Sequence, residues 1–272
     1  MGLMCEVLGV SRSGFYVWLT RPESKQARSN RELSAKIKEI HKESRETYGS
    51  PRVHAELCRR NEPCGKNRVA RVMREGGFHG KRRRRYRPKT TDSKHDLPIS
   101  PNLVQREFTA EAPNLLWLAD ITYVPTKEGW LYLASIIDVF SRTIVGWAMD
   151  DNMRKELAIA ALTMATAARR PGSGLIHHSD RGSQYASKAY RDALDDCEIA
   201  CSMSGVGNCY DNAMKESFFH TLKVECVPEG GFQTKSEAKS AIFEYIEGFY
   251  NRRRIHSSLG YRTPLEVEQG AA

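Results

Sequence analysis

The sequence predicts an α/β domain with a mixed sheet, preceded by a basic all-α region, and two observations support this division. The 272 residues include 42 Lys and Arg and 33 Asp and Glu, which gives a net charge of +9. This charge is unevenly divided, because residues 1–95 have a net charge of +14 and residues 96–272 a net charge of −5. From Leu115 onward, apolar strand-like runs replace the amphipathic helical pattern. A basic module that binds a polyanion is therefore expected beside a module with another task.

Composition excludes several classes of protein. Hydrophobic residues make up 40% and charged residues 28% of the chain, which is typical of a globular protein and too apolar for overall disorder. No apolar run approaches the roughly 18–20 residues of a membrane helix, and residues 1–8 lack the features of a signal peptide. Seven cysteines without a C-x-x-C pair predict reduced thiols rather than disulfides or a zinc site. We expect a cytoplasmic protein without a membrane partner.

The first helices are predicted within residues 4–20. Gly9 can end a short helix, and Ser11 can cap a second one, which is the outline of a helix-turn-helix. Apolar residues at helical spacing predict a third, amphipathic helix over 32–43.

A second helix pair follows. Ser50 before Pro51 predicts an N-cap with a first-turn proline, and Asn67 predicts the cap of a helix that stops at Gly76. Helical pairs of this kind also occur in folds that bind nothing, so the pattern alone leaves DNA binding open.

A run of basic residues favours DNA binding. Its charges are too dense to pack against one another, and on a nucleic acid they would release counterions from the phosphates. The alternative is a solvated linker, and both descriptions fit a flexible arm along the DNA backbone. The expected contacts are Lys81, Arg82, Arg83, Arg84, Arg85 and Arg87. Residues 1–95 are thus predicted as the DNA-binding region, and 96–110 as a linker.

The second half is predicted as one domain over residues 111–250. Three consecutive strands are expected, followed by alternating helices and strands, which is the order of an RNase H-like α/β domain. The strands are 115–124, 130–138, 143–150, 174–180 and 200–204, and the helices are 152–169, 183–199, 211–225 and 235–253.

Three carboxylates stand out in this domain. Asp120 lies in the middle of an apolar strand, where a charge is costly unless it is paired or binds a metal. Asp180 follows the fourth strand, at an end where ligand-facing residues commonly lie. Glu216 shares one helix face with Lys223, opposite the apolar stripe that contains Phe218.

Together these acids predict a site of hard oxygen ligands. Mg²⁺ is typically held by few carboxylates, and two such ions can promote in-line displacement at phosphorus. The alternative for any single acid is a cap, a surface charge or an ion pair, and we assign Asp138, Asp150, Asp195 and Asp196 to that class.

The motifs around the acids resemble a known family. Asp120 in LADITY, Asp180 in HHSDRGSQY and Glu216 in YDNAMKESFF, with 35 residues between the last two acids, resemble the DDE core of retroviral integrases and bacterial insertion-sequence transposases. More narrowly, the chain resembles the OrfB proteins of the insertion-sequence-three group. LGVSRSGFYVWL and TYGSPRVHAEL match the family's N-terminal region, and YNRRRIHSSLGYRTPLEVE matches its C-terminal signature in the predicted tail, 251–272.

The resemblance implies a DNA transposase that cleaves and joins strands at the ends of an insertion sequence. It implies that Asp120, Asp180 and Glu216 bind Mg²⁺ or Mn²⁺, two ions for each site, and that Lys223 contacts DNA near the scissile phosphate. Arg254 would be structural or would contact DNA. It further implies that the chain forms a homo-oligomer on DNA and has the upstream-frame OrfA protein as a partner. The implied location is bacterial and nucleoid-associated. The rivals are a nuclease of the same fold that does not join strands, and a catalytically silent DNA-binding regulator.

Overall fold

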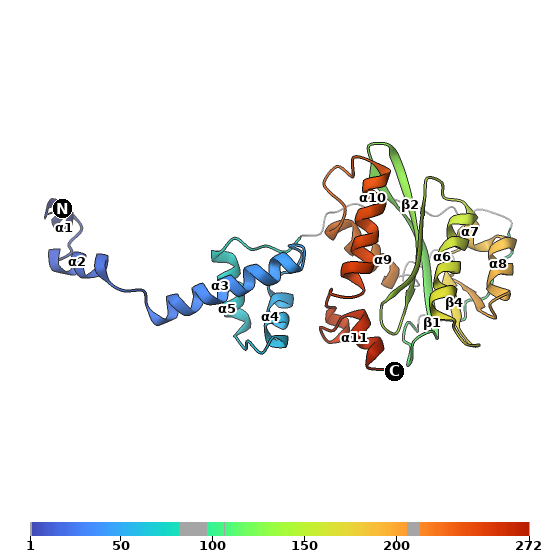
Figure 1. Cartoon of the computed structure of the whole chain (residues 1–272), viewed down its shortest axis with the longest axis horizontal. Helices are drawn as coiled ribbons and strands as arrows, with labels where there is room; N and C mark the ends of the chain where they lie inside the picture. Colours follow the sequence, from blue (N-terminus) through green and yellow to red (C-terminus); the bar gives the residue numbers. More distant parts are fainter. Residues whose placement is uncertain (1, 82–96, 106, 206–212, 272) are drawn as a thin grey trace. The chain divides into compact units, whose positions relative to one another are not determined.

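The computed structural model describes residues 2–81, 97–105, 107–205 and 213–271, and it divides the chain into two compact units, 1–79 and 80–272 (Figure 1). The division falls inside the predicted region 1–95. Among the described residues, no helix combines the length and the apolar character that crossing a membrane requires. The six cysteines within the described ranges are free thiols.

The first unit contains five helices in its described part. Ser11 and Ser24 cap the second and third helices, because each side chain accepts a hydrogen bond from a first-turn backbone N–H, Gly14 N at 3.0 Å and Ala27 N at 3.1 Å. The third helix therefore begins well before the predicted residue 32. The helices are α1 (Gly2–Val7), α2 (Arg12–Thr20), α3 (Lys25–Glu43), α4 (Ser50–Arg59) and α5 (Lys66–Glu75).

Helices α3, α4 and α5 share a small core. Ile37, Val53, Leu57 and Val69 are fully buried there. The predicted caps of the last two helices are displaced: Gly49 and Gly65 stand at the N-cap positions, so Ser50 and Asn67 lie inside the helices. In contrast, α1 and α2 expose most of their apolar side chains, including Trp18 at 69%.

The second unit is built on a mixed five-stranded sheet in the order β3-β2-β1-β4-β5. The first three strands pair antiparallel, and β4 and β5 continue the sheet parallel to β1. This arrangement confirms the predicted RNase H-like fold. The strands are β1 (Leu116–Thr126), β2 (Gly129–Asp138), β3 (Ile144–Asp150), β4 (Ile176–Ser179) and β5 (Ala200–Met203).

Helices cover both faces of this sheet (Figure 1). One face packs on α6 (Lys155–Arg169), α7 (Ser183–Ala186) and α8 (Lys188–Asp195). Gly146 permits the close approach of α6, since a Cβ there would lie 2.3 Å from the Ala161 carbonyl oxygen. The helix predicted over 183–199 is interrupted, because Ser187 has an extended backbone (ψ 144°) and caps α8.

The opposite face packs on the C-terminal helices (Figure 1). They are α9 (Ala213–Glu225) and α10 (Lys235–Phe243), which continues as π-helical turns over Glu244–Tyr250. The predicted single helix 235–253 therefore changes its hydrogen-bond pattern halfway. The last helix, α11 (Pro264–Gln269), follows near the C-terminus.

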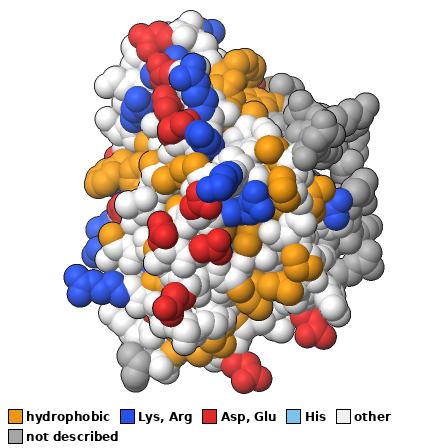
Figure 2. All heavy atoms as spheres, turned by 90° about the vertical axis from the view of Figure 1, so that its right-hand side faces the viewer, with side chains coloured by type: hydrophobic (Ala, Val, Ile, Leu, Met, Phe, Trp, Pro, Cys, Tyr) orange, Lys and Arg blue, Asp and Glu red, His pale blue; other side chains and the backbone are white. Residues whose placement is uncertain are grey.

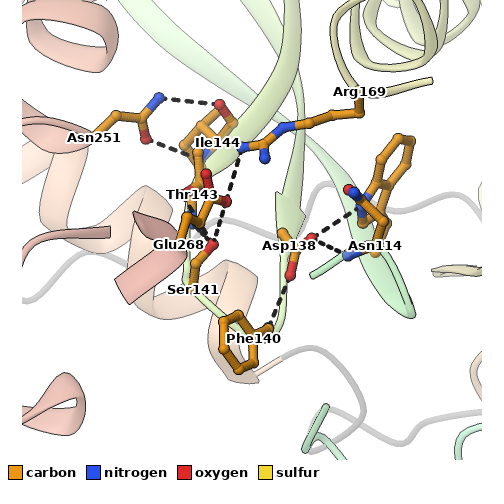
Figure 3. Close-up of polar contacts among 10 residues, drawn as sticks. Asn114, Asp138, Phe140, Ser141, Thr143, Ile144, Arg169, Asn251 and Glu268 are labelled. Carbon is orange, nitrogen blue, oxygen red and sulfur yellow. Dashed lines mark hydrogen bonds and ion pairs between the residues drawn. The ribbon is translucent and has the colours of Figure 1, made fainter. Parts of the chain in front are cut away.

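The C-terminal tail is joined to the β2–β3 hairpin (Figure 3). The Asn251 amide accepts a hydrogen bond from Ile144 N at 2.9 Å and donates one to Ile144 O at 3.0 Å. On α11, the Glu268 carboxylate accepts from Ser141 Oγ at 2.7 Å and pairs with Arg169 of α6 at 2.8 Å. Residues 251–271 thus belong structurally to the second unit.

Asp138 has a structural role at the end of β2 (Figure 3). Its carboxylate is buried and accepts hydrogen bonds from Asn114 N at 2.7 Å, Phe140 N at 2.9 Å and Trp117 Nε1 at 3.3 Å. Because one carboxylate accepts all three hydrogen bonds, Asp138 stabilises the turn after β2. This agrees with its assignment as a structural acid.

Candidate active site

Asp120 lies in the middle of β1, directly opposite Ser135 of β2 in the antiparallel ladder. The carboxylate is half-buried, and its Oδ1 accepts a hydrogen bond from Ile121 N at 2.8 Å. Alternation along the strand places Ala119 and Ile121 in the core beneath α6, so Asp120 points to the face that α9 covers.

Asp180 directly follows β4, which runs parallel to β1 as its neighbour. Gly182 N donates to Asp180 Oδ1 at 2.9 Å, so the loop fixes the orientation of this carboxylate. The glycine fits closely: a Cβ at position 182 would lie 3.0 Å from Asp180 Oδ1. Arg181, in the same loop, donates a hydrogen bond from its Nε to Ser204 O at 2.6 Å.

Glu216 is in the first turn of α9 and is exposed. The same helix buries Phe218 and Leu222 in the core of the second unit. The acid and the apolar stripe therefore lie on different sides of α9, which is the arrangement that the spacing predicts.

The three acids share one electrostatic environment around Asp120. Burial, together with the negative charges of Asp180 and Glu216, raises the pKa of the Asp120 carboxyl to about 7. The ammonium of Lys215 and the N–H of Ile121 act in the opposite direction. Carboxylates that disfavour each other's charge in this way are suited to a divalent cation.

Within the described ranges, no group of three His, Cys, Asp or Glu side chains is spaced as a ready metal cluster. The donor chemistry nevertheless fits Mg²⁺ or Mn²⁺, because all three side chains offer hard oxygens and two of them are oriented by backbone N–H groups. Residues 206–212, which lead into α9, lie outside the described structure.

Lys215 is a polar residue at this site that the sequence reasoning missed. Its side chain is fully buried, and its ammonium donates hydrogen bonds to Ser135 O at 2.7 Å and Ser135 Oγ at 2.5 Å. The pKa of Lys215 is lowered to about 7, because the effect of burial outweighs the opposing effect of the Asp120 charge. The available signal was its position three and seven residues before Phe218 and Leu222, on the buried stripe of the helix.

Lys223 lies two turns beyond Glu216 on α9 and is half-buried. Its Nζ stands 4.6 Å from the centre of the Tyr123 ring on β1. Burial lowers the pKa of the Lys223 ammonium, and the charge of Asp120 raises it. Lys223 is thus a cation on the active-site side of the sheet.

The structure places Arg254, for which the sequence left a structural role or a DNA contact open, in the interior. The residue is 3% exposed and forms a bidentate ion pair with Glu225 at the end of α9. A guanidinium held in this way is not presented to a phosphate backbone, so the contacts favour the structural alternative for Arg254.

The predicted basic arm is described only at its first residue. Lys81 is exposed, and its Nζ donates to Glu225 O at 2.8 Å. Arg82, Arg83, Arg84, Arg85 and Arg87 lie outside the described residues. On the face drawn in Figure 2, acidic and basic side chains of the described residues are interspersed rather than gathered by sign.

A mixed five-stranded sheet with acids from β1, the end of β4 and α9, following a helical basic unit, defines a DDE-type DNA transposase or integrase. Family models agree with this class. Residues 110–209 and 216–270 match two models described as "Integrase core domain", and residues 28–86 match "HTH-like domain".

Full-length relatives identify the family. The chain is 49% identical to the insertion element IS600 uncharacterized 31 kDa protein of Shigella sonnei, covering 98% of this chain and 97% of the relative. It is 40% identical to the transposase InsF for insertion sequence IS3A of Escherichia coli strain K12, covering 97% and 92% respectively. The chain belongs to the IS3 family of insertion-sequence transposases.

Solved retroviral structures were also matched. The HTLV-2 integrase catalytic core domain in complex with magnesium is 16% identical, with a TM-score of 0.41, covering 58% of this chain and 98% of the viral chain.

Proposed function

We propose that Asp120, Asp180 and Glu216 together hold two divalent cations, Mg²⁺ or Mn²⁺, and form the active site for DNA cleavage and strand transfer. The observation that carries the proposal is the placement of Asp120, a half-buried strand carboxylate within electrostatic reach of the other two acids. When bound, such ions would activate first water and then a 3′-hydroxyl, and would stabilise the leaving oxygen.

Groups of the chain itself orient the proposed metal ligands and the DNA. Backbone N–H groups of Ile121 and Gly182 fix one oxygen each of Asp120 and Asp180, which keeps these ligands in place without a reorganisation step. Lys223 supplies a positive charge on the same side of the sheet, and we assign it to the phosphate backbone near the scissile bond.

DNA is the partner that the charge division supports. The helical unit 1–79 and the arm at Lys81–Arg87 would hold the inverted repeats through phosphate contacts, while the second unit carries the chemistry. Pairing two element ends requires two active sites, so we propose that the chain acts as a homo-oligomer on DNA. The OrfA protein is the proposed accessory partner.

Two alternative functions can be distinguished from this proposal by the reaction products that they would give. A nuclease of the same fold would release cleaved strands without joining them, and a silent regulator would bind DNA without cleaving it. The intact set of three acids favours an active enzyme over the silent regulator.

The test uses the purified chain with labelled insertion-end DNA and Mg²⁺. The parent should give cleaved and joined strands, and Asp120→Asn, Asp180→Asn and Glu216→Gln should each lose both products while retaining DNA binding. Asp195→Asn removes an exposed acid at the end of α8 and serves as the matched control. Cleavage without joining would support the nuclease, and activity in the three variants would contradict the site.

A further inference from the structure

Lys215 occupies an interior position that a lysine rarely takes. None of its side chain is exposed, and besides its two hydrogen bonds to Ser135 its Nζ lies 4.7 Å from the centre of the Phe219 ring and 5.3 Å from that of Phe218. A buried ammonium is unfavourable unless its protons are bonded, so these contacts determine where the side chain must lie.

The partner of Lys215 connects it to the active site. Ser135 is the cross-strand neighbour of Asp120, and residues directly opposed in an antiparallel pair have Cα atoms roughly 4.5–5.5 Å apart. Lys215 itself immediately precedes Glu216. The Lys215–Ser135 contact therefore joins the helix that carries the third acid to the strand position opposite the first acid.

We propose that Lys215 is a positioning residue that holds Glu216 of α9 in register with Asp120 of β1. The inference rests on the proposed metal-binding role of these acids. Mg²⁺ requires nearly ideal octahedral geometry, so a small shift of α9 against the sheet would move a ligand out of place. Lys215 acts through the helix and through Ser135, without touching the substrate.

A purely electrostatic role for Lys215 predicts the opposite effect on metal binding. Its ammonium lies close enough to Asp120 for their charges to interact, and a nearby positive charge repels a cation. Removal of this charge from an otherwise unmoved site would tighten metal binding. Loss of a positioning contact would weaken it, so the sign of the change separates the two roles.

The first measurement is titration calorimetry of Mn²⁺ and Mg²⁺ into the full-length chain. Lys215→Met should weaken metal binding about 10–100-fold, as supporting groups behind metal ligands commonly do. Ser135→Ala keeps the carbonyl acceptor and should weaken binding less. Lys239→Met makes the same change at an exposed lysine of α10 and should match the parent. Unchanged or tighter metal binding in Lys215→Met would overturn the proposal.

The second measurement needs no metal. Hydrogen exchange of the α9 amides should be faster in Lys215→Met, which loses both hydrogen bonds to Ser135, than in the parent and Lys239→Met. Ser135→Ala loses only the bond to the hydroxyl and should show a smaller increase. If Lys215→Met does not fold, the test uses Ser135→Ala instead. In that variant, α9 exchange and metal affinity that both equal those of the parent would overturn the inference.

Failure of the proposed function has a different signature. In that case the parent would bind no metal, or Asp120→Asn would bind as the parent does, whereas exchange of α9 would still report on the Lys215–Ser135 contact.

Discussion

Arg254 and Glu225 form a buried bidentate ion pair that joins the C-terminal tail to the end of α9. Arg254 Nη2 lies 2.7 Å from Glu225 Oε1, and Arg254 Nε lies 2.8 Å from Glu225 Oε2. Tyr245 Oη donates to the same carboxylate at 2.8 Å. The helix that carries Glu216 is thus anchored near both ends, by Lys215 at its start and by this pair at its last residue.

Removal of one member of the pair is expected to destabilise the second unit. Arg254→Met leaves a buried carboxylate without its counter-charge, which typically costs about 3–5 kcal/mol. Chemical denaturation should show this loss, while the double variant Glu225→Met/Arg254→Met should recover much of it. The exposed Arg252→Met is the control. A stable Arg254→Met protein with weakened DNA binding would instead support a DNA contact.

Lys223 is expected to contribute one phosphate contact and to support cleavage. Lys223→Met should lower DNA affinity and reduce the slope of log affinity against log salt by about 0.9, the value for one neutralised phosphate. Fluorescence anisotropy across a salt series measures both quantities, and Lys239→Met should retain the parent slope. A Lys223→Met slope equal to that of the parent would remove Lys223 from the DNA contacts.

The arm at Arg82–Arg85 should dominate the salt dependence of binding. Substitution of all four arginines by glutamine should flatten the slope by up to about 3.6, because each phosphate contact contributes about 0.9. The measurement is again anisotropy, with insertion-end DNA and an unrelated duplex of equal length. A parent protein whose affinity hardly changes with salt would contradict the arm's role.

His177 of β4 should make the second unit sensitive to acid. Burial lowers the pKa of this imidazole from 6.5 to about 3, with the charges of His178 and Lys215 acting in the same direction. Because the unfolded chain binds the proton more readily, the stabilising contribution is complete above about pH 6.5 and is lost as the pH falls toward 3.

Between pH 7 and pH 5, His177 should account for about 2 kcal/mol of lost stability. His177→Gln keeps a hydrogen-bonding group near Tyr190 Oη, which lies 3.0 Å from His177 Nε2, and should show a flatter stability profile in thermal unfolding over this range. His79→Gln changes an exposed histidine and should follow the parent. Parallel profiles for parent and His177→Gln would contradict this assignment.

The sequence was sufficient to predict the fold because the strand pattern after Leu115 is strong and uninterrupted. Alternation, turn residues and helical spacing are local signals, and each acid could be placed on its element from them. The predicted helix boundaries were less accurate where the backbone conformation sets them. Gly49 and Gly65 occupy N-cap positions that the sequence assigned to residues with capping side chains. Ser187 interrupts a helix that the apolar periodicity alone would continue.

The contacts behind the site could not be predicted in the same way. The burial of Lys215 and Arg254 was not predicted, because charged side chains are normally exposed. Their partners Ser135 and Glu225 are 80 and 29 residues away in the chain. Only the tertiary arrangement shows that one lysine lies inside the core and that one arginine is neutralised there. Local patterns place the three acids on their elements, whereas the contacts behind them depend on long-range pairing.

Metal rescue tests the central claim most directly, because it asks whether a given side chain touches the ion. Asp120→Cys, Asp180→Cys and Glu216→Cys replace a hard oxygen by a softer thiolate, which disfavours Mg²⁺ and favours Mn²⁺ by comparison. The assay is strand cleavage of insertion-end DNA with each metal. We predict activity lost in Mg²⁺ and partly restored in Mn²⁺ for each cysteine variant but not for the matching Asn or Gln variant. Full activity of the cysteine variants in Mg²⁺ would contradict the assignment of these acids as metal ligands.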